Sequence, residues 1–276
     1  MTEIGSFGIW RGEADLDESL AATLEQLGYS AIWIGGSPDG DLQIAERLLG
    51  ATRSITVGTG IVNIWKDDPA TVARSFHRLE SRFPNRFLLG IGVGHPEATS
   101  EYTKPYAALV HYLDELDLAQ VPVSKRLLAA LGPKVIQLGA DRTAGVHPYL
   151  TTPEHTRRAR EILGPDELLV PEQKVVIDTD AERARSIGRP RVADPYLGLT
   201  NYVSNLKSLG WSDKDLADGG SDALIDALVL HGDAETVAAG LRAHLDAGAN
   251  QVAIQLLTAP GADPVPGFTA LAEALR

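Results

Sequence analysis

Short apolar runs alternate along the chain with longer stretches in which apolar residues recur every three or four positions. The short runs are typical of buried strands, and the longer stretches are typical of amphipathic helices. We expect strands over residues 4–10, 30–34, 55–61, 86–92, 127–131, 146–150, 168–177 and 251–256. We expect helices over residues 15–27, 42–51, 69–83, 104–118, 153–163, 181–189, 199–209, 221–228, 234–247 and 268–275. This alternation predicts a parallel sheet built from βαβ units.

Residues 123–139 allow two assignments. By periodicity alone, residues 124–131 form a helix and residues 134–138 a strand. The opposite assignment places a strand over residues 127–131 and a helix that opens at Pro133. We adopt the second assignment, because proline is favoured at a first helical position and the strand–helix alternation is then preserved.

The pattern then contains eight strands and eight main helices, which predicts a single-domain α/β fold, a (β/α)8 TIM barrel over residues 1–276. An open doubly wound sheet is the runner-up, and it usually has fewer strands. Residues 178–221 form the longest and most irregular stretch between strands, so we expect a helical insertion there. In a barrel, ligands bind at the carboxyl ends of the strands.

The strand that begins after Asn85 ends in glycines at alternate positions, Gly90, Gly92 and Gly94, followed by His95. Alternate glycines remove the side chains from one face of a strand, so a flat ligand can lie against bare backbone. The alternative is a tight strand-to-loop turn with close packing of protein atoms. The other predicted strand ends are rich in glycine and asparagine, with few carboxylates, which suits a broad flat ligand.

Composition narrows the class of protein. Hydrophobic residues make up 44% and charged residues 22% of the chain, as in a globular protein with a full core. The net charge of −12 argues against nucleic acid or an anionic membrane as a partner. There is no cysteine, no apolar segment long enough to span a membrane, and no signal peptide, so we expect a cytoplasmic protein.

Candidate chemistry is sparse. No pair among the seven histidines has the spacing of a metal site, and no hydrolase elbow or Walker sequence is present, so we expect no metal. Two predicted helix starts are candidate anion sites, since N–H groups and the positive helix end face outward there. These starts are Gly132-Pro133-Lys134 and Thr151-Thr152-Pro153, and ordinary helix initiation explains either equally well.

His95 is the titratable side chain just past the glycine-rich strand, and its ordinary pKa range suits proton transfer. A surface or capping role for His95 is an equal alternative. Trp10 and Trp65 each lie near a strand end and are candidates for the wall of an aromatic pocket, or for plain core residues.

Several motifs resemble those of the bacterial luciferase-like oxidoreductases. They are Thr59-Gly60-Ile61-Val62-Asn63, Asp68-Pro69-Ala70, and the stretch from Phe83-Pro84-Asn85-Arg86-Phe87 to Gly92. The segments Asp141–Gly145, His147–Leu150 and Thr152–Thr156 are similar to the deazaflavin-dependent branch of this family from actinobacteria. The resemblance covers nearly the whole chain, and it implies the same barrel that the strand count predicts.

The resemblance implies coenzyme F-420, a deazaflavin hydride carrier, or alternatively FMN as the cofactor. In such proteins a bulge after the third strand carries a non-prolyl cis peptide behind the ring, and the matching position here is Gly60–Ile61. The ring would lie against Val93-Gly94-His95. The phosphate would lie near the helix starts at Gly132 and Thr151. The candidate cofactor-binding residues are Gly36, Ser37, Gly60, Ile61, Asn63, Val93, Gly94, Gly132, Pro133, Lys134, Thr151 and Thr152.

His95, the candidate catalytic residue, stands where a related sugar-phosphate dehydrogenase has a glutamate. Gly36-Ser37 replaces an Asp-His pair of that enzyme, so its activity should not be transferred. We expect an F-420-dependent oxidoreductase that passes a hydride between the deazaflavin and a small organic substrate. An FMN-dependent monooxygenase and a non-catalytic flavin-binding or deazaflavin-binding barrel are the alternatives. Members of this family are often dimers, so a homodimer is one expected assembly.

Overall fold

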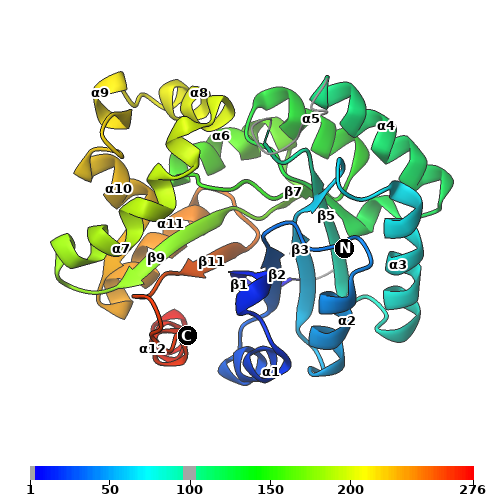
Figure 1. Cartoon of the computed structure of the whole chain (residues 1–276), viewed down its shortest axis with the longest axis horizontal. Helices are drawn as coiled ribbons and strands as arrows, with labels where there is room; N and C mark the ends of the chain where they lie inside the picture. Colours follow the sequence, from blue (N-terminus) through cyan, green and yellow to red (C-terminus); the bar gives the residue numbers. More distant parts are fainter. Residues whose placement is uncertain (1–3, 96–103) are drawn as a thin grey trace.

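The structure is a computed structural model, and it describes residues 4–95 and 104–276. The strands are β1 (Phe7–Gly12), β2 (Ala31–Gly35), β3 (Thr56–Gly60), β4 (Val62–Asn63), β5 (Phe87–Gly92), β6 (Arg126–Leu128), β7 (Gly145–Val146), β8 (Leu168–Leu169), β9 (Glu172–Ile177), β10 (Val229–Gly232) and β11 (Val252–Leu256). Each adjacent pair of strands is parallel. Figure 1 shows these strands curled inside a layer of helices.

The main helices are α1 (Glu18–Leu27), α2 (Gln43–Gly50), α3 (Pro69–Arg82), α4 (Pro105–Leu118), α5 (Pro133–Arg142), α6 (Pro153–Leu163), α7 (Ala181–Ala193), α8 (Thr200–Ser208), α9 (Asp213–Leu216), α10 (Asp222–Leu228), α11 (Ala234–Asp246) and α12 (Val265–Leu275). The prediction of a helix that opens at Pro133 is confirmed, with Gly132 as its extended N-cap residue. Proline occupies a first-turn position of α3, α4, α5 and α6, where it leaves no helical hydrogen bond unmade.

The segment from β8 to β9 closes the sheet into a ring. β8 pairs with β7, whereas β9 pairs with β11, which in turn pairs with β1. The Val170 N–H donates to the Val146 carbonyl at 3.0 Å, and the Pro171 carbonyl accepts from the Ala253 N–H at 2.9 Å. One continuous stretch of chain therefore bonds to strands on both of its sides. The predicted TIM-barrel class is confirmed.

Two tryptophans fill the inside of the barrel. Trp33 is fully buried, and its Nε1 donates to Gln251 Oε1 at 2.7 Å. A Cβ atom at Gly58 would lie 2.5 Å from the Trp33 ring, and one at Gly35 would lie 2.0 Å from the Trp10 ring. Glycine at these two positions leaves the volume that the indoles occupy, so the interior is a packed core and not a channel.

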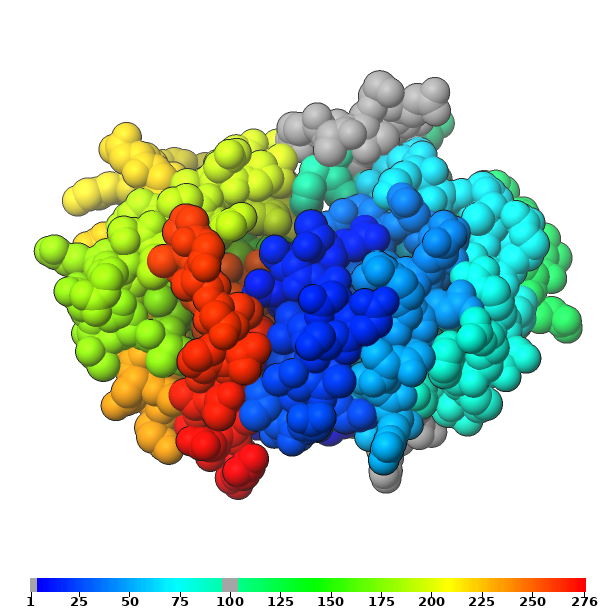
Figure 2. All heavy atoms as spheres, turned by 60° about the horizontal axis from the view of Figure 1, so that its bottom comes forward, coloured from blue at the N-terminus to red at the C-terminus, as the bar shows by residue number. Residues whose placement is uncertain are grey.

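The first and last helices cover the seam between the chain ends. α12 packs beside α1, where the Tyr29 hydroxyl donates to the Phe268 carbonyl at 2.8 Å and the two rings meet edge to face at 6.2 Å. Figure 2 shows the red C-terminal segment lying along the blue N-terminal one. No helix in the described part of the chain is long and apolar enough to cross a membrane.

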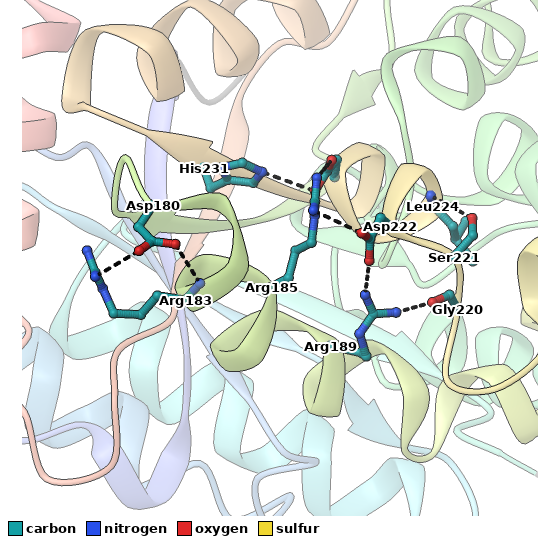
Figure 3. A network of polar contacts seen from close by, with 10 residues as sticks. Asp180, Arg183, Arg185, Arg189, Gly220, Ser221, Asp222, Leu224 and His231 are labelled. Atoms are coloured by element: carbon teal, nitrogen blue, oxygen red, sulfur yellow. Dashed lines mark hydrogen bonds and ion pairs between the residues drawn. The ribbon is translucent and has the colours of Figure 1, made fainter.

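Helices α7, α8 and α10 form a small unit around an apolar cluster that they share with β9 and β10. Val192, Leu206, Leu224 and Ile225 are fully buried in that cluster. A polar network on its outer side joins α7 to α10 and β10 (Figure 3). In it, Arg185 forms ion pairs with Asp222 and Asp226, and Arg189 with Asp222. The predicted insertion at residues 178–221 covers the first part of this unit, and its division from the barrel stays a prediction.

Several local predictions are wrong. The strand expected over residues 146–150 is only β7, and the strand expected over residues 168–177 is divided into β8 and β9. Helix α7 extends through Pro190 to Ala193, beyond the predicted end at residue 189. A mid-helix proline costs a hydrogen bond, but the buried Val192 and the Arg189 ion pair hold the last turn in place. Strand β10 is absent from the prediction, and β1 spans residues 7–12 instead of 4–10. Pairing with neighbouring strands, and not the local hydrophobic pattern, determines where these two strands begin and end.

The Glu25 side chain fixes the turn that leads into β3. Its carboxylate accepts hydrogen bonds from the backbone N–H groups of Arg53, Ser54 and Ile55 at 2.7 to 3.0 Å. Burial alone would raise the pKa of Glu25, but these N–H groups outweigh burial and lower it to about 2.

We expect Glu25→Gln to lower the free energy of unfolding at pH 7 by about 1–2 kcal/mol, since the carboxylate is only partly buried. The carboxylate's contribution is present above its ordinary pKa of 4.5 and is lost as pH falls toward 2, so the two proteins should converge in acid. Urea unfolding at pH 7 and pH 3 measures this. Glu18→Gln, at an exposed ion pair on the same helix, is the control and should change little. An equal deficit at both pH values would contradict the assignment.

Candidate functional site

A cavity of about 530 Å³ opens at the carboxyl ends of six neighbouring strands. It lies at the end of the barrel where ligands bind in this architecture. In the described part of the chain, no Asp, Glu, Lys or Arg side chain lines it. The lining residues are Trp10, Gly36, Ser37, Gly60, Ile61, Asn63, Val93, Gly94, His95, Pro105, Tyr106, Leu109, Ala129, Ala130, Leu131, Gly132, Val135, His147, Tyr149, Tyr196, Asn201 and Tyr202.

A one-residue bulge forms one wall of this cavity. Gly58 pairs with Leu88 and Val62 pairs with Ile91, so the first strand has one more residue between the two pairs than the second. Thr59 Oγ1 donates to the Gly90 carbonyl at 2.7 Å and accepts from the Gly90 N–H at 2.9 Å. The Gly60–Ile61 peptide within the bulge is cis, at the position that the family resemblance implied.

The alternate glycines of β5 have two different roles. A Cβ atom at Gly90 would lie 2.0 Å from the Thr59 carbonyl oxygen, and one at Gly92 would lie 2.8 Å from Ala129. These two glycines therefore make room for protein atoms, as the close-packing interpretation held. Gly94, with φ +58°, and Gly60 do line the cavity, so backbone is exposed to a ligand there.

The floor of the cavity is formed by Trp10 and His147. The His147 ring stacks on Trp33 at 4.8 Å, and its Nδ1 lies 2.6 Å from the Val170 carbonyl. A carbonyl only accepts, so Nδ1 carries the proton and Nε2 is a bare acceptor. Burial lowers the pKa of His147 to about 4, which keeps the ring neutral at pH 7.

Aromatic rings from separate parts of the chain form a second wall. Tyr196 lies in the 3-10 turn Tyr196–Gly198, and Tyr202 in α8. The two rings meet at 4.9 Å, and Tyr202 lies 5.5 Å from the His95 ring. Tyr149 continues the wall, 5.3 Å from Tyr196 and 5.2 Å from Trp10. The cavity thus has both exposed backbone and aromatic rings in its lining, a combination that suits a planar ligand.

A buried ion pair supports the aromatic wall from behind. Lys174 Nζ lies 3.9 Å from the centre of the Tyr149 ring and 3.2 Å from Glu172 Oε1. Both ionisable side chains are fully buried. Burial lowers the pKa of Lys174 and raises that of Glu172, while their mutual attraction opposes both shifts. The cation–π contact fixes the Tyr149 ring without placing a charge in the cavity wall.

Nine of the residues predicted from the sequence line this cavity: Gly36, Ser37, Gly60, Ile61, Asn63, Val93, Gly94, His95 and Gly132. Four others lie outside the lining. Pro133 and Lys134 are exposed in the first turn of α5, Thr151 is buried, and Thr152 is the N-cap residue of α6. His155 Nε2 donates to the Leu131 carbonyl at 2.9 Å, which ties the starts of α5 and α6 together.

Sequence analysis assigned no role in the cavity to His147 or to the tyrosines of the aromatic wall. The predicted strand over residues 146–150 placed His147 near the start of that strand. The observed strand β7 ends at Val146, which brings His147 to the rim. Tyr196 and Tyr202 belong to the irregular insertion, where no periodic pattern predicts direction. Of the two tryptophan candidates, Trp10 lines the cavity and Trp65 does not. Among residues 4–95 and 104–276, no cluster of three or more His, Cys, Asp or Glu could hold a metal ion.

Comparison with known proteins agrees with this architecture. Residues 14–117 match the family model described as luciferase-like monooxygenase. A 4-hydroxyprotoasukamycin monooxygenase of Streptomyces nodosus subsp. asukaensis is 32% identical over 93 residues, 31% of this chain and 24% of that protein. The chain aligns with only 24% of the length of each curated relative that matches. The predicted resemblance to the luciferase-like family is confirmed.

Two solved structures share the fold over their whole length. An F-420-dependent secondary alcohol dehydrogenase, solved with an F-420–acetone adduct, aligns with a TM-score of 0.74, 14% identity and 99% coverage of both chains. The oxygenating constituent of 3,6-diketocamphane monooxygenase from Pseudomonas putida, solved with FMN, aligns with a TM-score of 0.71 and 14% identity, covering 97% of this chain and 96% of that one. The chain therefore has the fold of luciferase-like oxidoreductases and monooxygenases.

We expect Gly90→Ala to destabilise the protein by about 3 kcal/mol, because the new methyl group would displace the Thr59 carbonyl and with it the bulge. Gly198→Ala is the matched control, since no atom lies within 4 Å of a Cβ there and φ is not positive. Urea denaturation of both variants measures the difference. Equal stability of the two would show that β5 tolerates a side chain facing the bulge.

The buried histidines predict a loss of stability in weak acid. Burial lowers the pKa of both His147 and His244 from 6.5 to about 4, so the unfolded chain binds more protons between these values. Stability should be complete above pH 6.5 and fall toward pH 4, by on the order of 3 kcal/mol per histidine. Urea unfolding of wild type, His244→Gln and the exposed-site control His77→Gln measures this. An unchanged slope with pH in His244→Gln would contradict the prediction.

Proposed function

We propose that this protein is a coenzyme F-420-dependent oxidoreductase that passes a hydride between the deazaflavin ring and a small organic substrate. The observation that carries the proposal is the cavity itself, in which the bulge at Gly60–Ile61 and an aromatic wall border an uncharged space. A flat redox ring needs a flat support, close approach of backbone and exclusion of water. When bound, the cofactor would supply the hydride chemistry, and the protein would supply position and electrostatics.

The residues divide into groups by what they would do. The backbone of Gly60, Ile61, Val93 and Gly94 would support one face of the ring. The first turn of α5, at Gly132-Pro133-Lys134, would receive the phosphate, because helix N–H groups and the positive end of the helix dipole face outward there. Lys134 is exposed beside this turn and would add a positive charge at the mouth. Thr151 and Thr152 at the start of α6 would extend this region.

His95 would hold or move a proton beside the aromatic wall. Its ring lies 6.0 Å from Tyr196 and 5.5 Å from Tyr202, at the side of the cavity away from the floor. The described cavity wall has no carboxylate, and the ordinary pKa range of a histidine such as His95 suits proton transfer near pH 7. Catalysis would then come mainly from holding the substrate and the cofactor ring in the right relative position for hydride transfer.

An FMN-dependent monooxygenase is the second candidate. The matching family model is described as a luciferase-like monooxygenase, and one solved structure with this fold holds FMN. Such an enzyme would use the same ring site, with the FMN phosphate at the start of α5. The absence of an acidic side chain from the described cavity wall favours simple hydride transfer, which is why F-420 is our first choice.

A fluorescence titration with F-420 and FMN side by side tests the proposal. We expect F-420 to bind and FMN to bind at least tenfold more weakly. Ala129→Trp, which places an indole in the cavity, should weaken F-420 binding by tenfold or more through steric exclusion. Ala107→Trp, on an exposed position of α4, is the control and should bind as wild type does. Binding of FMN alone would overturn the cofactor choice, and equal F-420 binding by both variants would place the cofactor elsewhere.

A further inference from the structure

Two buried nitrogen atoms at the cavity floor have no hydrogen-bond partner among the residues that the structure describes. They are Trp10 Nε1 and His147 Nε2. Trp10 is 9% and His147 2% exposed. Trp33, which stacks on His147, has its Nε1 paired with Gln251. An unpaired buried polar atom costs on the order of 1–3 kcal/mol, and these two nitrogens belong to residues that line one cavity.

The two nitrogens have opposite hydrogen-bonding roles. An indole Nε1 always donates. His147 Nε2 can only accept, because the proton is on Nδ1, 2.6 Å from the Val170 carbonyl. Stacking on Trp33 holds the imidazole in this orientation. The floor therefore offers one donor and one acceptor, both uncharged.

The donor and the acceptor converge on one place. A Cβ atom built on Gly60 would lie 2.8 Å from Trp10 Nε1 and 2.9 Å from His147 Nε2. Both nitrogens therefore lie on the same side of Gly60, near enough to each other for one oxygen atom on the cavity side to bond to both of them. A side chain at position 60 would press against both nitrogens, and glycine avoids this.

One donor beside one acceptor favours some oxygen-containing ligand groups over others. A hydroxyl accepts from Trp10 and donates to His147, which satisfies both. A carbonyl leaves the His147 acceptor unpaired, and a carboxylate would face that lone pair with no cation in the described lining. The surrounding walls are apolar and aromatic. A neutral molecule with a hydroxyl group meets all of these conditions.

We propose that Trp10 and His147 bind the hydroxyl oxygen of the substrate, and that the substrate class is a neutral alcohol. This inference rests on the proposed function only in that the same cavity holds the substrate. The sequence pointed to Trp10 only as a candidate wall of an aromatic pocket, and it assigned no binding role to His147. The two side chains would discriminate an alcohol from a ketone or hydrocarbon of the same shape.

Nuclear magnetic resonance tests this without any turnover. The chain has four tryptophans, and Trp10→Phe identifies the indole N–H signal of Trp10 by its loss. Cyclohexanol, cyclohexanone and methylcyclohexane are titrated into protein labelled with ¹⁵N at tryptophan and histidine, with and without F-420. We expect cyclohexanol to shift both the Trp10 N–H and the His147 Nε2 signals. Cyclohexanone should shift the indole signal alone, and methylcyclohexane should shift neither by hydrogen bonding.

The variants give the matching affinities. Trp10→Phe and His147→Phe should each weaken cyclohexanol binding about three- to tenfold while leaving methylcyclohexane binding unchanged. Trp211→Phe, outside the cavity lining, is the control. Equal responses to cyclohexanol and methylcyclohexane in wild type would overturn the inference, and so would a shift of both signals by F-420 alone without one by cyclohexanol. Alcohol binding without binding of F-420 or FMN would support this inference and reject the proposed function.

Discussion

The structure of the cavity depends on one extra residue between Gly58 and Val62. The strand that follows cannot pass this bulge with a side chain at position 90, because the Thr59 carbonyl occupies that place. The Thr59 hydroxyl then bonds twice to the Gly90 backbone, so the distortion is held by the neighbouring strand and not by a loop. A strand end that would otherwise lie flat in the barrel is turned into a wall of exposed backbone.

The barrel beneath supports this wall because it is filled. Trp33 and Trp10 occupy the interior, and glycine at positions 58 and 35 admits their rings. The cavity therefore lies at the carboxyl ends of the strands, beyond these two rings. Trp10 and His147 form its floor and limit its depth. The bend between β8 and β9 closes the ring on the far side, where the same stretch of chain bonds to β7 and to β11. Floor and wall are thus parts of one rigid core.

Much of the barrel is predictable from sequence, since apolar periodicity reports burial and proline reports helix starts. Pro133 resolved the ambiguous region correctly, and the glycine-rich strand pointed to the rim at which the cavity opens. Pro190 misled, because buried contacts beyond it hold the helix together. The aromatic wall was not predictable: Tyr196 and Tyr202 lie close to His95 only through folding of the irregular segment. The unpaired nitrogens of Trp10 and His147 depend on distances that no sequence pattern contains.

The backbone wall and the aromatic wall of the cavity are carried by different parts of the chain. The bulge lies between β3 and β5, whereas Tyr196 and Tyr202 lie in the segment that connects α7 to α10 and pack in a different apolar cluster from the bulge strands. Mutations in that segment alter the shape of one wall and leave the glycine positions of the other untouched. Evolution can therefore change which molecules the cavity accepts through substitutions at the aromatic wall. The backbone wall at the bulge stays the same.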